Sequence, residues 1–214
     1  MKEIIEITEL FVQKNVIGDS TGHDWYHIDR VRKMALYIHE REKKGDAFII
    51  EMAALLHDIP DEKLVDSKKE GELKLSLFLH SLPIEPSIKQ LVTNIILSIS
   101  YKGGYNTPLK SVEAMIVQDA DRIDAIGAIG IARAFAYGGK KGQAIYDPAL
   151  TVRPTMTVEE YRHGQSSSIH HFYEKLLKIT NLLNTDTARQ IAEQRHHFMK
   201  LFLTEFYREW NDLS

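Results

Sequence analysis

Apolar residues recur at helical spacing through nearly the whole chain, and this pattern limits the possible folds more than any other feature. Runs that alternate apolar and polar residues between tight two-residue turns are not found, so strands are not expected. We expect an all-α fold, a single helical bundle over residues 1–214 in which helices 167–212 pack on the same core. The spacing predicts helices over 2–17, 24–44, 46–58, 69–81, 85–101, 109–137, 167–183 and 185–212.

Several residues mark where the predicted helices begin and end. Asp46 and Thr185 are suited to cap helix N-termini, and Gly45 is suited to end the helix before it. The segment from Ala47 to Leu56 is almost wholly apolar, which is typical of a helix buried on most sides. The stretch 138–166 is long and irregular, and a loop of that length is usually functional or mobile, so a lid is one option.

Composition excludes several classes of protein. The chain has no cysteine, which excludes disulfide scaffolds and thiolate metal sites and fits a cytoplasmic protein. It lacks an apolar run long enough to cross a membrane and a basic, apolar leader, so no membrane partner is expected. The net charge of −3 provides no overall basic field for nucleic acid. A small-molecule substrate is the better expectation.

Histidine and aspartate occupy helix positions where a core residue should be apolar. His57 continues the apolar stripe of helix 46–58, and Asp58 adjoins it. His27 lies beside the apolar face of helix 24–44, and Asp119 interrupts the apolar stripe of helix 109–137. A buried carboxylate needs a compensating partner, and one divalent cation could serve all four residues. Core residues satisfied by their neighbours would give the same pattern, so residue chemistry alone leaves both readings open.

Three motifs resemble the H…HD…D signature of the HD-domain superfamily of metal-dependent phosphohydrolases. They are His27, the pair His57–Asp58 within 55–59, and the segment 118–124 that contains Asp119. Segments 22–31, 100–104, 121–133 and 171–177 also resemble the small stand-alone bacterial members. The resemblance implies a metal held in the core between helices by these four residues, with the ligand motifs all within 23–124.

The resemblance also indicates one cation rather than two. Dinuclear members have additional histidines between the His-Asp pair and the last aspartate, and here that interval holds only His80. Two imidazoles and two carboxylates suit an ion with open positions for water and substrate. We expect Mn²⁺ or Mg²⁺, with Fe²⁺, Ni²⁺ and Co²⁺ as further options.

Acidic and basic residues around the motifs provide candidates for catalysis and substrate binding. By resemblance, Asp61 and Asp66 orient or deprotonate the attacking water, and a solvated acidic loop is the alternative reading. Other residues could hold phosphate groups or the substrate, although most could equally be surface charges or ion-pair partners. They are Arg30, Lys63, Lys102, Arg122, Arg133 and His171.

The resemblance implies a nucleotide as substrate. Small HD proteins of this kind look like nucleoside triphosphate pyrophosphohydrolases, which release a monophosphate and pyrophosphate. A 5′-nucleotidase or a phosphodiesterase of the same superfamily is an alternative, and a non-catalytic nucleotide-binding module is an alternative of another class. A monomer and a homodimer are both compatible with the sequence, which fixes neither base nor sugar preference.

Overall fold

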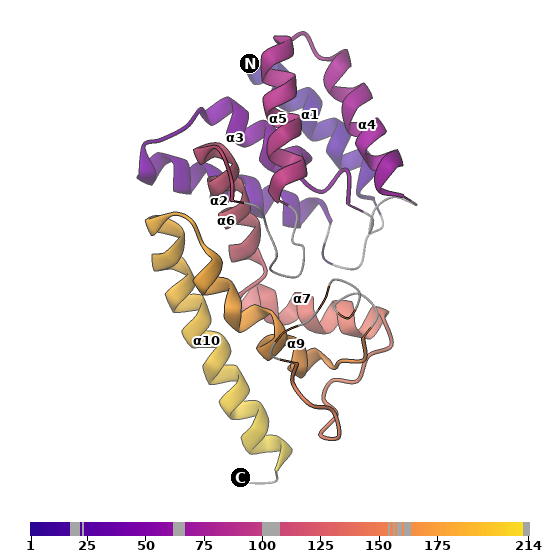
Figure 1. Cartoon of the computed structure of the whole chain (residues 1–214), viewed down its shortest axis with the longest axis vertical. Helices are drawn as coiled ribbons and strands as arrows, with labels where there is room; N and C mark the ends of the chain where they lie inside the picture. The colour runs from indigo at the N-terminus through magenta and orange to yellow at the C-terminus, as the bar shows by residue number, and fades with distance from the viewer. Residues whose placement is uncertain are drawn as a thin grey trace. The chain divides into compact units, whose positions relative to one another are not determined.

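A computed structural model describes residues 1–17, 22, 24–61, 67–99, 108–153, 155, 157, 160 and 164–211. All regular structure in these ranges is helical, which confirms the all-α prediction (Figure 1). The chain divides into two compact units, Met1–Asp121 and Arg122–Ser214, which are described separately. The prediction of one domain over 1–214 stays a prediction. Within the described ranges, the helices are too short or too polar to cross a lipid bilayer.

The first unit is built around one buried helix. Its helices are α1 (Lys2–Asn15), α2 (Trp25–Glu42), α3 (Ala47–Leu56), α4 (Lys68–Ser81), α5 (Pro86–Ile99) and the first ten residues of α6 (Val112–Asp124). Helix α3 packs against α1, α2 and α5, and α4 packs against α5 (Figure 1). Almost every residue of α3 is buried, because all of its residues except Glu51 are apolar. The predicted buried helix is confirmed.

Side-chain caps fix the starts of the helices. Asp24 Oδ1 accepts a hydrogen bond from His27 N at 2.8 Å, and Asp46 Oδ1 accepts one from Ile49 N at 3.0 Å. Thr185 caps the last helix in the same way. The predicted caps at Asp46 and Thr185 are therefore confirmed.

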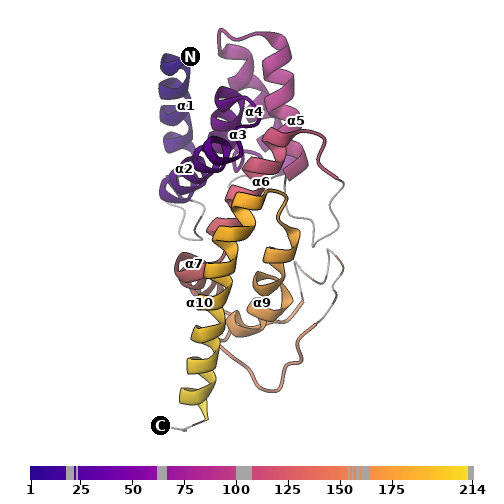
Figure 2. The same ribbon diagram turned by 90° about the vertical axis from the view of Figure 1, so that its left-hand side faces the viewer.

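The second unit contains α7 (Gly127–Lys140), α9 (Ser168–Glu174), the 3₁₀-helix η1 (Leu176–Leu182) and α10 (Asp186–Trp210). Helix α10 packs against α7 and η1, and α9 packs against both of these elements (Figure 2). The predicted continuous helix over 109–137 is wrong. The chain leaves α6 at Asp124 and restarts at Gly127, whose φ of +78° is readily adopted only by glycine.

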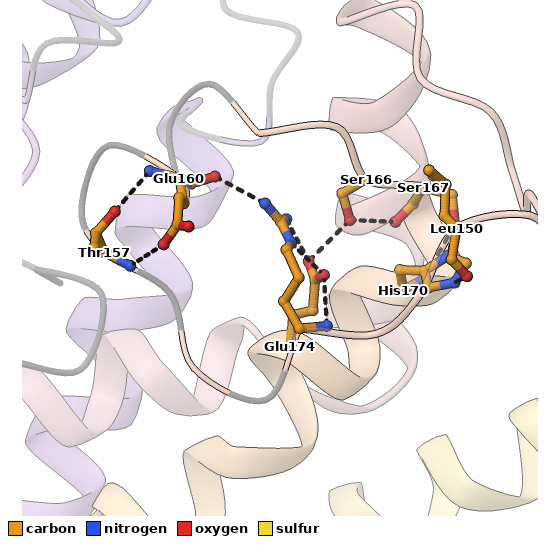
Figure 3. A network of polar contacts seen from close by, with 8 residues as sticks. Leu150, Thr157, Glu160, Ser166, Ser167, His170 and Glu174 are labelled. Carbon is orange, nitrogen blue, oxygen red and sulfur yellow. Dashed lines mark hydrogen bonds and ion pairs between the residues drawn. The ribbon is translucent and has the colours of Figure 1, made fainter.

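An ion pair to the buried Glu174 organises the described part of the stretch between α7 and α9 (Figure 3). Arg153 donates from Nε to Oε1 of Glu174 at 2.7 Å and from Nη2 to Oε2 at 2.8 Å. Ser166 Oγ donates to the same carboxylate at 2.9 Å, and Arg153 Nη1 donates to the carbonyl of Glu160 at 3.0 Å. The Glu174 side chain is only 3% exposed, so its charge depends on these donors.

His170 attaches a second point of this stretch to α9. Its Nε2 lies 3.0 Å from the carbonyl oxygen of Leu150, and its Nδ1 lies 2.6 Å from Ser167 Oγ (Figure 3). Because a carbonyl only accepts, Nε2 carries a proton. The stretch 138–166, predicted as irregular, is therefore held to α9 at two points. The carbonyl of Leu150 bonds His170, and the side chain of Arg153 bonds Glu174.

Candidate metal centre

Two histidines from different helices meet inside the first unit. His27 lies in the first turn of α2 and is fully buried, and His57 directly follows the last residue of α3 and is 8% exposed. Their Nε2 atoms lie 3.3 Å apart, and their rings are inclined at 69° with centroids 5.3 Å apart. Both rings therefore direct the same nitrogen to one point.

Two carboxylates border that point. Asp58 places Oδ2 at 3.3 Å from Nε2 of His27 and Oδ1 at 3.4 Å from Nε2 of His57. Asp121 places Oδ1 at 3.6 Å and 3.8 Å from the same two nitrogens. The Asp58 side chain is 7% exposed and that of Asp121 is 38% exposed, so Asp121 is the more accessible of the two carboxylates.

The separations of these atoms fit a divalent cation. Neighbouring ligand atoms of an octahedral ion with bonds of about 2.1 Å lie about 3.0 Å apart. The atoms here are only slightly farther apart, and those of His27, His57 and Asp121 all lie within 4.8 Å of one another. Imidazole nitrogen with carboxylate oxygen is a donor set that suits first-row divalent metals. The residues present can thus hold such an ion.

A hydrogen bond to the backbone fixes the His57 ring. Its Nδ1 lies 2.7 Å from the carbonyl oxygen of Ala54, within the same helix. The carbonyl can only accept, so Nδ1 must carry a proton, which leaves Nε2 as the nitrogen available to bind an ion. A hydrogen bond of this kind on the far nitrogen is typical of metal-bound histidine.

The carboxylate beside the two imidazoles belongs to Asp121, whereas the sequence predicts Asp119 as the fourth ligand. Asp119 is fully buried in α6. Side chains two residues apart on a helix point about 200° apart, so these two aspartates face different directions. The prediction for Asp119 remains untested, and the geometry favours Asp121.

The sequence alone hardly distinguishes Asp121 from Asp119 as the candidate ligand on α6. Helix α6 is buried on most sides, because Ile116, Val117, Ala120 and Ile123 are all fully buried. Periodicity therefore does not distinguish two aspartates in the same turn. The segment 118–124 that resembles the family contains both aspartates, and only the contacts distinguish them.

Two further predicted residues lie close in sequence to these ligands. The amide of Asp61 donates to the carbonyl of Asp58 at 2.9 Å in the turn that follows α3, which keeps Asp61 next to the His57–Asp58 pair. Arg30 lies one turn after His27 on α2 and is half-buried. Their predicted roles in catalysis and substrate binding stay predictions.

The remaining predicted residues are not tested by this geometry. Lys63, Asp66 and Lys102 lie outside the described residues. Arg122 and His171 belong to the second unit. Arg122 Nη1 bonds the carbonyl of Leu182, and Arg133, also in that unit, forms a 2.8 Å ion pair with Asp124. These contacts give both arginines structural roles within their own unit.

Comparison with known proteins finds relatives along the whole chain. The HD domain family matches residues 24–126. The uncharacterized protein YpgQ of Bacillus subtilis is 38% identical over 213 residues, which cover 98% of this chain and 96% of YpgQ. A crystal structure of YpgQ in complex with ADP has a TM-score of 0.76 at 36% identity and covers 96% of this chain and 97% of YpgQ.

Two other crystal structures are similar over nearly their full lengths. A Lactobacillus plantarum protein has a TM-score of 0.89 at 36% identity, with 99% of each chain covered. An HD-superfamily hydrolase from Bacillus thuringiensis has a TM-score of 0.77 at 46% identity, with 98% of each chain covered. With the domain match that contains His27, His57 and Asp58, these likenesses establish the family. The chain belongs to the HD-domain superfamily of hydrolases.

Proposed function

We propose that this protein is a metal-dependent phosphohydrolase that cleaves a phosphate ester or anhydride bond in a nucleotide. The observation that carries the proposal is the cluster of His27, His57 and Asp121, with the carboxylate of Asp58 within 3.4 Å of both imidazoles. The two imidazoles would supply neutral donors and the two carboxylates would balance the charge of one divalent cation. Mn²⁺ and Mg²⁺ are the first candidates, and Fe²⁺, Ni²⁺ and Co²⁺ are the others.

A bound cation would polarise a phosphoryl oxygen and lower the pKa of a coordinated water. The protein itself must orient the water and hold the substrate. The partly exposed Asp61, fixed in the turn next to Asp58, is suited to accept the proton of an attacking water. Arg30, half-buried one turn from His27, is suited to hold a phosphate oxygen, because a guanidinium can bind two oxygens at once.

A nucleotide substrate is supported by the ADP complex of YpgQ, which is similar to this chain over almost its full length. Within that class, we propose hydrolysis of a nucleoside or deoxynucleoside triphosphate to the monophosphate and pyrophosphate. The family resemblance of the motifs supports this choice. A 5′-nucleotidase and a phosphodiesterase use the same kind of metal centre and are the alternatives within the superfamily.

The test is to supply the metal-free protein with Mn²⁺ or Mg²⁺ and to identify the products formed from a nucleotide panel. Pyrophosphate from triphosphates is the expected product. Orthophosphate from monophosphates alone would make the protein a 5′-nucleotidase, and cleavage of cyclic nucleotides alone would make it a phosphodiesterase. Tight nucleotide binding without any product over hours would show a non-catalytic module. The His57→Ala variant is the control, and its activity should be lost.

A further inference from the structure

The two histidines of the proposed metal centre stand at opposite ends of their helices. The His57 ring is fixed directly, because its Nδ1 bonds the carbonyl of Ala54 at 2.7 Å. His27 stands in the first turn of α2, where backbone amides have no carbonyl partner within the helix. The backbone position of His27 therefore depends on what holds the start of that helix.

Asp24 provides this support. It is the N-cap of α2, in extended conformation, and its Oδ1 accepts the backbone N–H of His27 itself at 2.8 Å. The next amide, that of Ile28, bonds the carbonyl of Asp24 at 3.3 Å, so the cap residue holds two successive amides. The hydrogen bond to His27 is charge-assisted and stabilises the first turn.

We propose that Asp24 is a positioning residue of the metal centre, which sets the backbone of His27 so that Nε2 reaches the point shared with His57. The inference rests on the proposed function, since it requires His27 to bind the ion. Nε2 of His27 is placed 3.3 Å from both His57 Nε2 and Asp58 Oδ2, while ligand bonds tolerate deviations of only about 0.2 Å. Fraying of the first turn would move that nitrogen farther than this.

The structure offers a matched control. Asp46 caps α3 with the same geometry, its Oδ1 accepting Ile49 N at 3.0 Å, in the same unit. Its helix carries a ligand only at the opposite end, where the His57 ring has its own bond to Ala54. Replacing Asp46 removes an equivalent cap without freeing a turn that carries a ligand.

The experiment measures Mn²⁺ affinity by calorimetry, and Co²⁺ absorption as a report on ligand geometry, in the full chain. Asp24→Ala should weaken Mn²⁺ binding by roughly 10- to 100-fold and alter the Co²⁺ spectrum. Asp24→Asn, which can still cap, should restore binding to within about 3-fold of the unmodified protein. Asp46→Ala should bind Mn²⁺ as the unmodified protein does.

The outcomes separate this inference from the proposed function. If Asp24→Ala binds Mn²⁺ normally while His27→Ala does not, the positioning role is wrong and the metal centre stands. If Asp24→Asn is as impaired as Asp24→Ala, the charge rather than the cap is needed, which also overturns the inference. If the unmodified protein binds no divalent metal, the proposed function itself fails.

Discussion

Oδ1 of Asp121 lies 3.6 Å from Nε2 of His27, which places a carboxylate of α6 against the first turn of α2. This contact favours Asp121 over Asp119 as the ligand that α6 would supply to the proposed metal centre. It also yields a direct comparison of the two aspartates, because Asp119 and Asp121 belong to the same helix and differ in the direction they face.

We expect Asp121→Asn to weaken Mn²⁺ binding by at least about 100-fold and to abolish hydrolysis, because the variant loses a charged ligand. Asp119→Asn should keep Mn²⁺ affinity within about 10-fold of the unmodified protein. Metal content per chain after dialysis, with circular dichroism to confirm folding, checks both variants. Loss of metal in Asp119→Asn alone would return the ligand role to Asp119.

Metal binding should stabilise the folded protein. His27 on α2, Asp121 on α6 and the His57–Asp58 pair after α3 surround the proposed centre, and the unfolded chain offers no such arrangement. At a Mn²⁺ concentration 100 times Kd, the gain in free energy of unfolding should be about 2.7 kcal/mol. The Tm should therefore rise by several degrees, and EDTA should reverse the rise. His57→Ala should show no rise with Mn²⁺, and an unchanged response in that variant would contradict the site.

The ion pair between Arg153 and Glu174 predicts a large loss of stability on mutation. Glu174→Gln should lower the free energy of unfolding by about 2–3 kcal/mol, because it removes the charge that the half-buried Arg153 binds in bidentate fashion. Glu205→Gln is the control, since Glu205 forms a pair with Arg208 in which both side chains are about half exposed. Urea unfolding should show almost no change for that control.

The same carboxyl makes stability depend on pH. Burial acts to raise the pKa of Glu174, but the hydrogen bonds from Arg153 and Ser166 outweigh it and hold the pKa below the ordinary value of 4.5. A depressed pKa in the folded state stabilises the protein above pH 4.5, and this contribution is lost as the pH falls through the folded value. The difference in Tm between the unmodified protein and Glu174→Gln should thus be constant near pH 6–7 and shrink toward pH 3. A constant difference over the whole range would show that ionisation of Glu174 is not involved.

Gly127 and Gly139 lie at opposite ends of α7. Alanine substitutions at these two positions should change the stability of the protein in opposite directions. At Gly127 the φ of +78° is strained for alanine, and a Cβ would lie 2.9 Å from Cγ of Arg195. Gly127→Ala should destabilise by more than about 1 kcal/mol. At Gly139 no atom lies within 4 Å of an added Cβ, so alanine should stabilise by about 0.4–1 kcal/mol. Thermal unfolding of the two variants checks the sign of each change.

Local sequence patterns predict the helices of this protein well where a capping residue or an apolar run marks them. The caps Asp46 and Thr185 and the apolar run that forms α3 are all as expected. The break before Gly127 was missed because apolar spacing continues across it, and only the backbone conformation reveals the new helix. In the same way, Lys175 ends α9 with a φ of −136°, which divides the predicted helix 167–183.

The site was predictable where a residue stands out from its neighbours. His27 and His57–Asp58 interrupt apolar surfaces, and the structure brings them together. Local sequence patterns do not predict contacts between residues that lie far apart in the sequence. The pairing of Arg153 with Glu174 joins residues 21 positions apart, and neither has a spacing that points to the other.

The bond between His57 Nδ1 and the Ala54 carbonyl bears on how quickly the centre can be loaded. An incoming ion meets a ring that is already turned the right way and already in the required tautomer. No rotation or internal proton shift at this residue has to precede capture. Loading should then be limited by loss of water from the ion, and slowly dehydrating Ni²⁺ should enter more slowly than Mn²⁺.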